Sequence, residues 1–429
     1  MWRVVTVLLA AAAVTGTGCA MPEDAADSAL PGGQVSRLAV GGTTGSGLSL
    51  AASGQHVVGV WAATTESRTN IYAAVSHDGG ARFSAPIRVN DVDGDARVSG
   101  EQAPRVAIWK DLVVVTWSSR LTGESRVRMS QSNNGGQSFL PATTIHTENV
   151  TGARGWTSLA IAPDGAAHLA WLDGRNAEPA GSKPAASGGA HAMHKSLRQD
   201  IFQAVIRPDG EQYEAQVATN VCFCCKTAVA IGPDGTTYVA WRHIYPTNLR
   251  DMAVARSTDD GKKFSDPVRV NEDHWQIDAC PEDGPSIVVT GDGLLHIAWP
   301  TIVDAQTTRK AIFYSFSSDG GRTFAPRIRI DEEAATNRGA GHPQLARVGS
   351  ALVVAWDESN GAERRVRVRE LTSGSEDRSW TPKAGHVLTV SDADPATYPA
   401  VAATAGAMLI GWTASTSAGS EVRVRRLAR

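Results

Sequence analysis

The chain has 429 residues, of which 42% are hydrophobic and 20% are charged, and it contains 42 glycines. This length and composition suit one large all-β domain or two to three ordinary domains, and they exclude a disordered or fibrous protein. The formal net charge of -3 and the isoelectric point near 6.4 give no field that would gather nucleic acid. We therefore expect no nucleic-acid partner.

The first residues have the pattern of an export signal. Arg3 precedes an apolar run over 4–14 that is too short to span a bilayer, and small residues lead to Cys19. Residues 16–19 resemble the lipobox of bacterial lipoproteins, in which the cysteine becomes the lipidated N-terminus. We expect a signal peptide over 1–18, followed by a lipid anchor at Cys19 and a tether that together occupy 19–34, with no other membrane contact. The expected location is the bacterial cell envelope, periplasmic or at the cell surface; cleavage without lipidation would give a secreted protein.

The rest of the chain repeats a hairpin that ends in tryptophan. The seven tryptophans are Trp61, Trp117, Trp171, Trp241, Trp299, Trp356 and Trp412. In two copies, over 158–171 and 228–241, strands of period two flank a Pro-Asp-Gly turn. Two further strands follow the tryptophan, so that four short strands recur about every fifty to sixty residues, as is typical of a propeller blade.

Seven copies predict an all-β, seven-bladed β-propeller of four-stranded antiparallel blades over 35–429, with a six-bladed ring as the alternative. The last copy ends after one strand beyond its hairpin, over 421–425, whereas residues 34–40 form an orphan strand before the first hairpin. We expect this N-terminal strand to close the last blade and so remove the open edges. The third repeat contains a long insert over 173–199, rich in Ala, Gly, Ser and Pro, which we expect to be flexible.

A second motif, Ser-x-Asp-x-Gly-x-x-Phe, occupies the turn between the third and fourth strands. The four matches are Ser76, Asp78, Gly80 and Phe83; Ser132, Asn134, Gly136 and Phe139; Ser257, Asp259, Gly261 and Phe264; and Ser317, Asp319, Gly321 and Phe324. A tight turn needs an acceptor for backbone N–H groups and a glycine, and the phenylalanine packs between sheets. The motif resembles the Asp-box, or bacterial neuraminidase repeat, of sialidase-like β-propellers. In that family the box is structural and lies opposite the active site.

The resemblance also implies a set of site residues. Sialidases bind the substrate carboxylate with an arginine cluster and use an acid/base carboxylate and a tyrosine nucleophile assisted by a glutamate. Candidates in the loops that we expect on one face are Arg242, Arg250 and Arg338 for the anion, Glu282 or Asp283 for proton transfer, and Tyr398 as the nucleophile. Each could instead be structural, because turns and surface ion pairs are common.

The four cysteines of the mature chain other than Cys19 lie in two consecutive loops between blades. They are Cys222, Cys224, Cys225 and Cys280, and the ring should bring them together at the mouth of the central channel. Exported cysteines usually pair, which predicts two disulfides. One alternative is a thiolate site for Cu or Zn, to which nitrogen ligands could come from His191, His194, His243, His274 or His342. The other alternative is redox chemistry, because a vicinal Cys224–Cys225 pair would be strained and reducible.

A calcium loop is a further possibility, with a poorer match. Asp91, Asp93 and Asp95 resemble the start of such a loop, but Ala96 and Gln102 stand where a glycine and a bidentate glutamate are needed.

Three functions remain open from the sequence. The first, which we favour, is a propeller that binds a glycan, a peptide or a protein partner at the cysteine-bearing face. The second is an exo-sialidase-like glycoside hydrolase acting on acidic glycans. The third is a metal-binding or redox propeller. Whether the protein is an enzyme stays open.

Overall fold

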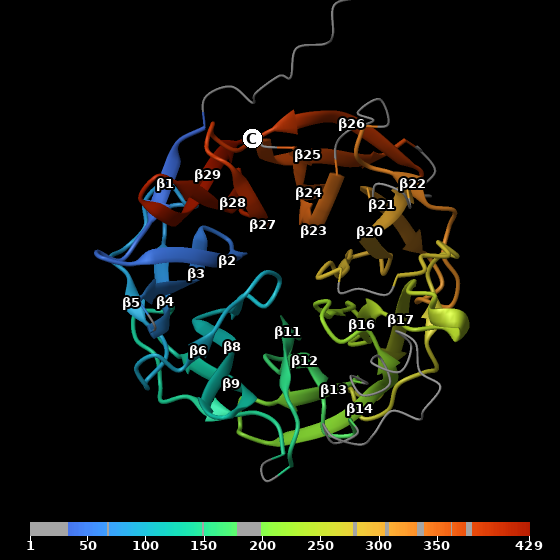
Figure 1. Ribbon diagram of the computed structural model, residues 1–429, viewed down its shortest axis with the longest axis horizontal. Coiled ribbons are helices and arrows are strands. Elements are labelled where there is room, and N and C mark those ends of the chain that lie inside the picture. The colour runs from blue at the N-terminus through green and yellow to red at the C-terminus, as the bar shows by residue number, and fades with distance from the viewer. Residues whose placement is uncertain are drawn as a thin grey trace, which may run out of the picture.

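The computed structural model describes residues 33–66, 68–147, 150–177, 199–277, 281–304, 309–332, 339–361, 363–374 and 380–429. These residues form seven antiparallel sheets arranged around a central axis, which confirms the predicted seven-bladed β-propeller and excludes the six-bladed alternative (Figure 1). Within these ranges no helix has both the length and the apolar character needed to cross a membrane.

Six blades are built from consecutive strands. The first contains β2 (Thr44–Ser53), β3 (His56–Thr65), β4 (Arg68–Ser76) and β5 (Ile87–Arg88); the second β6 (Ala96–Arg97), β7 (Arg105–Trp109), β8 (Leu112–Thr122), β9 (Glu124–Ser132) and β10 (Thr143–Thr144); the third β11 (Arg154–Ile161), β12 (Ala167–Asp173), β13 (Gln199–Ile206) and β14 (Gln212–Val221). The fourth contains β15 (Ala228–Ile231), β16 (Thr237–Arg242), β17 (Met252–Ser257) and β18 (Val268–Arg269), with the 3-10 turn η1 (Pro246–Asn248) between β16 and β17. The fifth contains β19 (Ser286–Val289), β20 (Leu295–Asp304), β21 (Arg309–Ser317) and β22 (Ile328–Arg329); the sixth β23 (Gly339–Val348), β24 (Ala351–Asn360), β25 (Glu363–Ser373) and β26 (Pro382–Thr389).

The seventh blade joins the two ends of the chain, as predicted. It consists of β27 (Ala396–Ala403), β28 (Ala407–Thr416), β29 (Gly419–Ala428) and β1 (Val35–Leu38). In Figure 1 the blue β1 lies beside the red β29, and the two pair antiparallel from Val35 opposite Arg425 to Leu38 opposite Val422. Leu38 is buried in the core between the seventh and first blades. The ring is thus closed by backbone hydrogen bonds between the first and last strands.

The repeated tryptophans fill the spaces between blades. All seven are buried, and each packs against apolar side chains of the preceding blade. Trp61 of the first blade, for example, shares a core cluster with Ala400 and Leu409 of the seventh. A large aromatic side chain suits this position because it spans the space between two sheets and gains the full benefit of burial. The tryptophan spacing in the sequence is therefore the spacing of the blades.

The four turns of the Ser-x-Asp-x-Gly-x-x-Phe motif, called Asp-box turns below, share one hydrogen-bond pattern. In the fifth blade, the Ser317 hydroxyl donates to Oδ1 of Asp319 at 2.7 Å and accepts the Gly321 N–H at 2.8 Å. Asp319 also accepts the N–H of Thr323 at 3.0 Å. The serine and glycine bonds recur at 2.7–2.9 Å in the other three turns, where Asn134 substitutes for aspartate once. The shared pattern of hydrogen bonds therefore lies within each turn, between the serine, the aspartate or asparagine, and the glycine.

The two ends of the innermost strands lie on opposite faces of the ring. The Gly79 N–H, in the first Asp-box, donates to the Gln55 carbonyl in the turn between β2 and β3 at 3.0 Å. The Asp-boxes therefore lie at the far ends of the innermost strands. The loops that enter these strands from the previous blade open on the other side, which we call the axial face.

Candidate functional site

Six blades place one residue with left-handed backbone near the start of the innermost strand. These residues are Gly47, Gly100, Trp156, Glu282, His342 and Tyr398, with φ between 44° and 65°. In four of the blades the strand pairing shifts at this residue, as in a β-bulge. Left-handed backbone costs a non-glycine residue about 1–3 kcal/mol and persists where the surrounding structure imposes it. Bulges re-aim side chains, so these positions orient side chains on the axial face.

Two of these side chains converge on a glycine in the second blade. A Cβ built on Gly100 would lie 3.0 Å from Oε2 of Glu282 and 3.2 Å from Oη of Tyr398. A larger residue at this position would displace both side chains. Gly100 thus leaves the space in which a carboxylate from the fifth blade and a phenol from the seventh approach each other.

His342 and Tyr398 are both bound by Asp357, which follows Trp356 in β24. Oδ2 of Asp357 lies 2.7 Å from Nδ1 of His342 and accepts the Tyr398 N–H at 2.8 Å. Burial disfavours the charged imidazolium, but the carboxylates of Asp357 and Asp283 outweigh burial and raise the pKa of His342. With Nδ1 bound to a carboxylate, His342 can use Nε2 to donate or accept a proton.

The hydroxyl of Tyr398 stays protonated near neutral pH. Burial, reinforced by the charges of Asp357, Glu282 and Glu101, raises the pKa of Tyr398 to about 12. The phenol is therefore a hydrogen-bond donor and a proton donor, and a phenolate nucleophile is disfavoured in this state.

Asp283 connects the neighbouring loops. Its buried carboxylate accepts the His342 N–H at 2.8 Å and pairs with the Lys310 ammonium. Burial opposes its ionisation, but Lys310 and His342 hold the pKa of Asp283 below its usual range. Arg242 lies behind it, donating to the backbone carbonyls of Asp283 at 2.8 Å and Arg250 at 2.9 Å. The Arg242 guanidinium thus holds the backbone of the loop that carries Asp283.

A second buried ion pair joins the second and fourth blades, which are not adjacent in the ring. Nζ of Lys226 lies 3.0 Å from Oε1 of Glu101 and donates to the Pro343 carbonyl at 3.1 Å. Oε2 of Glu101 accepts the backbone N–H groups of Lys226 at 3.2 Å and of Gly284 at 2.7 Å. These contacts join loops that enter the second, fourth, fifth and sixth blades.

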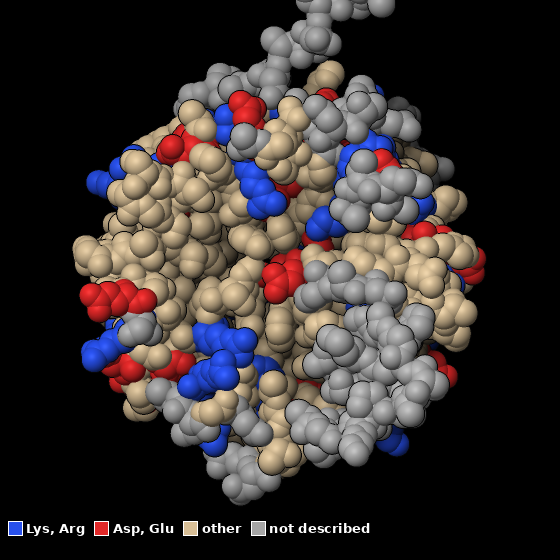
Figure 2. Space-filling view, viewed as in Figure 1, with Lys and Arg blue, Asp and Glu red and all other residues tan. Residues whose placement is uncertain are grey.

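We call these residues the axial cluster: Glu101, Lys226, Glu282, Asp283, Lys310, His342, Asp357 and Tyr398. A cavity of about 20 Å³ beside Gly100, Lys226, His342 and Tyr398 has room for one water molecule. A larger ligand would therefore have to lie over the cluster. Acidic and basic side chains both lie near the centre of the face shown in Figure 2.

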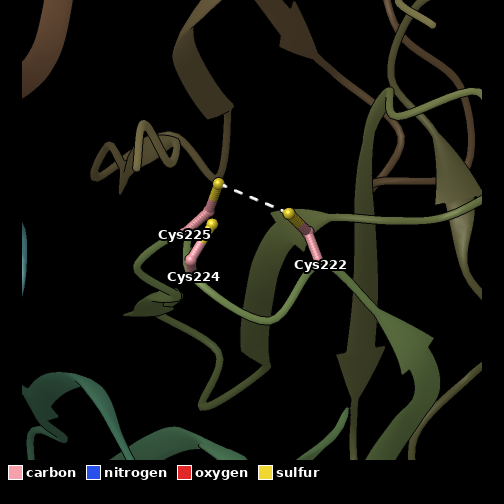
Figure 3. A group of neighbouring side chains, drawn as sticks. All are labelled: Cys222, Cys224 and Cys225. Atoms are coloured by element: carbon pink, nitrogen blue, oxygen red, sulfur yellow. Dashed lines mark hydrogen bonds between the residues drawn. The ribbon is translucent and has the colours of Figure 1, made fainter. Parts of the chain in front are cut away.

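The cysteine loop lies beside this cluster, and three of the four cysteines that the sequence predicts to be neighbours lie near one another in it. The sulfur atoms of Cys222, Cys224 and Cys225 lie within 4.8 Å of one another, and all three side chains are buried (Figure 3). Cys222 and Cys225 are free, with their sulfurs 3.7 Å apart, whereas Cys224 is disulfide-bonded. Asp283 donates its N–H to the sulfur of Cys225 at 3.5 Å.

Three of the predicted nitrogen ligands, His243, His274 and His342, lie among the described residues. In the described part of the chain, the group of sulfurs with metal-ligand spacing contains no histidine. His342 belongs to the axial cluster, and His274 is exposed, with Nδ1 near the Glu272 carbonyl. His243 accepts the Trp241 indole N–H at 3.2 Å, and burial lowers its pKa to about 4.

Other predicted residues make contacts within the protein. Arg250 is buried and donates to the sulfur of Cys222 at 3.3 Å. Asp93 binds Arg68 and Asn70, and Asp95 accepts the Trp117 indole N–H at 2.7 Å. The predictions for Cys19, His191, His194, Cys280 and Arg338 fall outside the described residues.

Four members of the axial cluster were not predicted as site residues: Glu101, Lys226, Lys310 and Asp357. For Lys226 the sequence carried a signal. It lies 15 residues before Trp241, just as Trp156, one of the residues with left-handed backbone, lies 15 residues before Trp171. Glu101 and Lys226 also lie in loops between blades, where the fold predicts function. Lys310 and Asp357 lie inside strand patterns, where the sequence does not distinguish them from structural residues.

No family model and no curated protein sequence matches the chain. Solved structures do match. A PL25 ulvan lyase has a TM-score of 0.57 at 10% identity, covering 91% of this chain and 95% of its own. The polysaccharide lyase Uly1 has a TM-score of 0.52 at 12% identity, covering 89% and 90%. The phage phi92 endosialidase has a TM-score of 0.50 at 11% identity, covering 92% and 69%. At these identities the likeness is one of fold: the chain is similar in fold to propellers of sialidase and polysaccharide-lyase type.

Proposed function

We propose that this protein is an exported glycan-binding propeller of the sialidase-like Asp-box superfamily, and that its ligand contacts the axial cluster. The observation that carries the proposal is the convergence of Glu282, His342 and Tyr398. Three different blades hold these side chains on left-handed backbone around the axis. A fold gains no stability from repeated strain at equivalent positions, and strained backbone gathers at functional sites.

The chemistry of the cluster favours a polyhydroxylated ligand. Carboxylates accept hydrogen bonds from sugar hydroxyls, the phenol of Tyr398 donates, and the rings of His342 and Tyr398 offer apolar surface. The cluster carries charges of both signs, with Lys226 and Lys310 already paired to carboxylates. The three solved structures reported above are described as two polysaccharide lyases and an endosialidase, and a further ulvan lyase structure is bound to -[GlcA(1-4)Rha3S]-. Uronic acid-containing oligosaccharides are therefore the first ligands to test.

Isothermal titration calorimetry with defined oligosaccharides tests the proposal. We expect binding by the wild type and an affinity about tenfold lower in Glu282→Gln, because the variant loses a charged hydrogen-bond acceptor. Glu211→Gln is the matched control, because Glu211 is exposed and pairs with Arg207, which also contacts Asp260 on the Asp-box face. Binding that is equally strong in Glu282→Gln, or the lack of binding across acidic and neutral glycans, would reject the axial cluster as a glycan site.

A second function, cleavage of the bound glycan, is favoured by the proton-transfer groups. His342 has a basic imidazole oriented by Asp357, and Tyr398 is a protonated donor beside Glu282. Such a pair can remove and supply protons at one bond. A lyase would form an unsaturated product that absorbs in the ultraviolet, whereas a hydrolase would release reducing ends without that absorbance. With neither signal, the protein would be a binding module.

Two further expectations from the sequence belong to this proposal. Lipidation at Cys19 would hold the protein in the cell envelope, and Cys19→Ser should release it into the soluble fraction. Cu or Zn at the cysteine loop remains a third function; elemental analysis of natively exported protein, with thiols counted in the same sample, measures it directly.

A further inference from the structure

Two free thiols lie in contact with each other beside Asp283 of the axial cluster. Cys222 and Cys225 occupy the first and last positions of a Cys-x-x-Cys segment in the loop between β14 and β15, and their sulfur atoms are 3.7 Å apart (Figure 3). The pair is separate from Cys224, which is disulfide-bonded. Disulfide formation between the two requires a small movement of side chains that are already neighbours.

The two sulfurs have different electrostatic surroundings. The hydrogen bond from Cys225, together with the charges of Arg250 and Arg242, outweighs burial and lowers the pKa of Cys222 to about 6. Burial raises the pKa of Cys225, and the Cys222 thiolate raises it further. The contact with the Arg250 guanidinium favours a thiolate at Cys222, so Cys222 is the expected nucleophile and Cys225 the expected resolving thiol.

The same surroundings favour redox chemistry over a metal site. The Arg250 guanidinium donates to the Cys222 sulfur at 3.3 Å, so a metal cation there would have to lie against a fixed positive charge. A thiolate used in exchange gains from the same charge, which stabilises the reactive form.

We propose that Cys222 and Cys225 form a redox-active dithiol that is oxidised by exchange with an external disulfide. The Cys222 thiolate attacks one sulfur of the incoming disulfide, forms a mixed disulfide and expels one thiolate. Cys225 then loses its proton and attacks the Cys222 sulfur, which closes the Cys222–Cys225 bond and expels the second thiolate. The protein dithiol loses two electrons and two protons, and the incoming disulfide becomes two thiols.

Closure would be transmitted to the axial cluster. The Cys225 sulfur accepts the Asp283 N–H, and Lys226 follows Cys225 directly. Arg242, which donates to the Asp283 carbonyl, lies close enough to affect the pKa of both thiols. Both sulfurs are buried, so exchange requires local opening of the loop and should be slower than at an exposed thiol.

Disulfide mapping in glutathione redox buffers tests the proposal on full-length Cys19→Ser protein. After acid quenching and alkylation, mass spectrometry should show Cys222 and Cys225 changing together from two alkylated thiols to one disulfide. Cys225→Ser should instead accumulate a glutathione adduct on Cys222. The assignment would be overturned if Cys222 and Cys225 stay reduced in every buffer, if the wild type carries a glutathione adduct on Cys225 alone, or if a Cys222–Cys224 bond forms.

The rate of alkylation identifies the nucleophile independently of any glycan. In Cys225→Ser, the reaction of Cys222 with iodoacetamide should rise with pH, and Arg250→Gln should move the midpoint upward. If Arg250→Gln does not fold, Cys222→Ser is used instead: its remaining thiol, Cys225, should react with iodoacetamide more slowly than Cys222 does in Cys225→Ser. A Cys225 that reacts as fast as Cys222 would contradict the proposal. Glycan affinity, measured separately in both redox states, reports only on the proposed function.

Discussion

His342 and Tyr398 come from neighbouring blades, and their rings lie 4.3 Å apart. One carboxylate fixes this arrangement, because Oδ2 of Asp357 contacts the imidazole of His342 and the backbone N–H of Tyr398. Asp357 therefore contributes to the raised pKa of His342 and holds the backbone of Tyr398. Removing the charge of Asp357 should therefore affect both residues while their own side chains stay unchanged.

Asp357→Asn should lower the pKa of His342, because Asp357 contributes to the raised value. A raised folded-state pKa stabilises the protein below the unfolded value near 6.5, and this stabilisation is lost as pH rises through the folded value. Above about pH 6.5 the variant should lose the part of this pH dependence that Asp357 contributes, while the part due to Asp283 remains. Imidazole NMR titration and denaturation at several pH values measure both effects. An unchanged His342 titration would show that Asp357 does not control it.

Tyr398→Phe should weaken glycan binding by about threefold to tenfold, the effect of one lost hydrogen bond, with little change in thermal stability. The ring and its contact with His342 are retained, so only the donor is removed. Tyr213→Phe is the matched control, because the Tyr213 hydroxyl donates to the Asp260 carbonyl on the Asp-box face. Equal affinity losses in the two variants would indicate a general effect on the fold.

Glu101→Gln should destabilise the protein by about 3–5 kcal/mol, because it leaves the buried Lys226 ammonium without its charged partner. The double variant Glu101→Gln/Lys226→Met should recover part of this loss, since it removes both charges. Urea denaturation of the four proteins gives the coupling energy. Additive effects would mean that the two side chains contribute independently.

Ser317→Ala should lower the free energy of unfolding by about 1–3 kcal/mol, because the Gly321 N–H and Asp319 lose a buried partner. Glycan affinity should not change, since this turn lies on the face opposite the axial cluster. Denaturation and calorimetry on the same sample check both statements. Reduced affinity in a fully folded sample would place a ligand contact on the Asp-box side.

Most of the fold could be predicted from local sequence patterns. Trp61 and its six counterparts mark the blades because each space between sheets needs one large side chain. The orphan strand before the first hairpin predicted the pairing of β1 with β29 because an unpaired edge must be covered.

The site was only partly predictable. The sequence singled out Glu282, Asp283, His342 and Tyr398 as chemistry-bearing residues in inter-blade loops, but not how they meet. Asp357 was missed because an aspartate within a strand pattern carries no mark of the imidazole that binds it. The pairing of Glu101 with Lys226 depends on positions 125 residues apart that only ring closure brings together.

The closing strand also determines how an anchored molecule would face its surroundings. Gln34, just before β1, accepts the Arg426 N–H, and the Arg426 side chain donates to Gly79 in the first Asp-box. The chain thus enters the ring on the Asp-box side. If Cys19 carries lipid, the intervening residues can reach at most about 50 Å from the membrane. The Asp-box face would then lie toward the bilayer and the axial face away from it, open to polymers too large to pass beneath the ring.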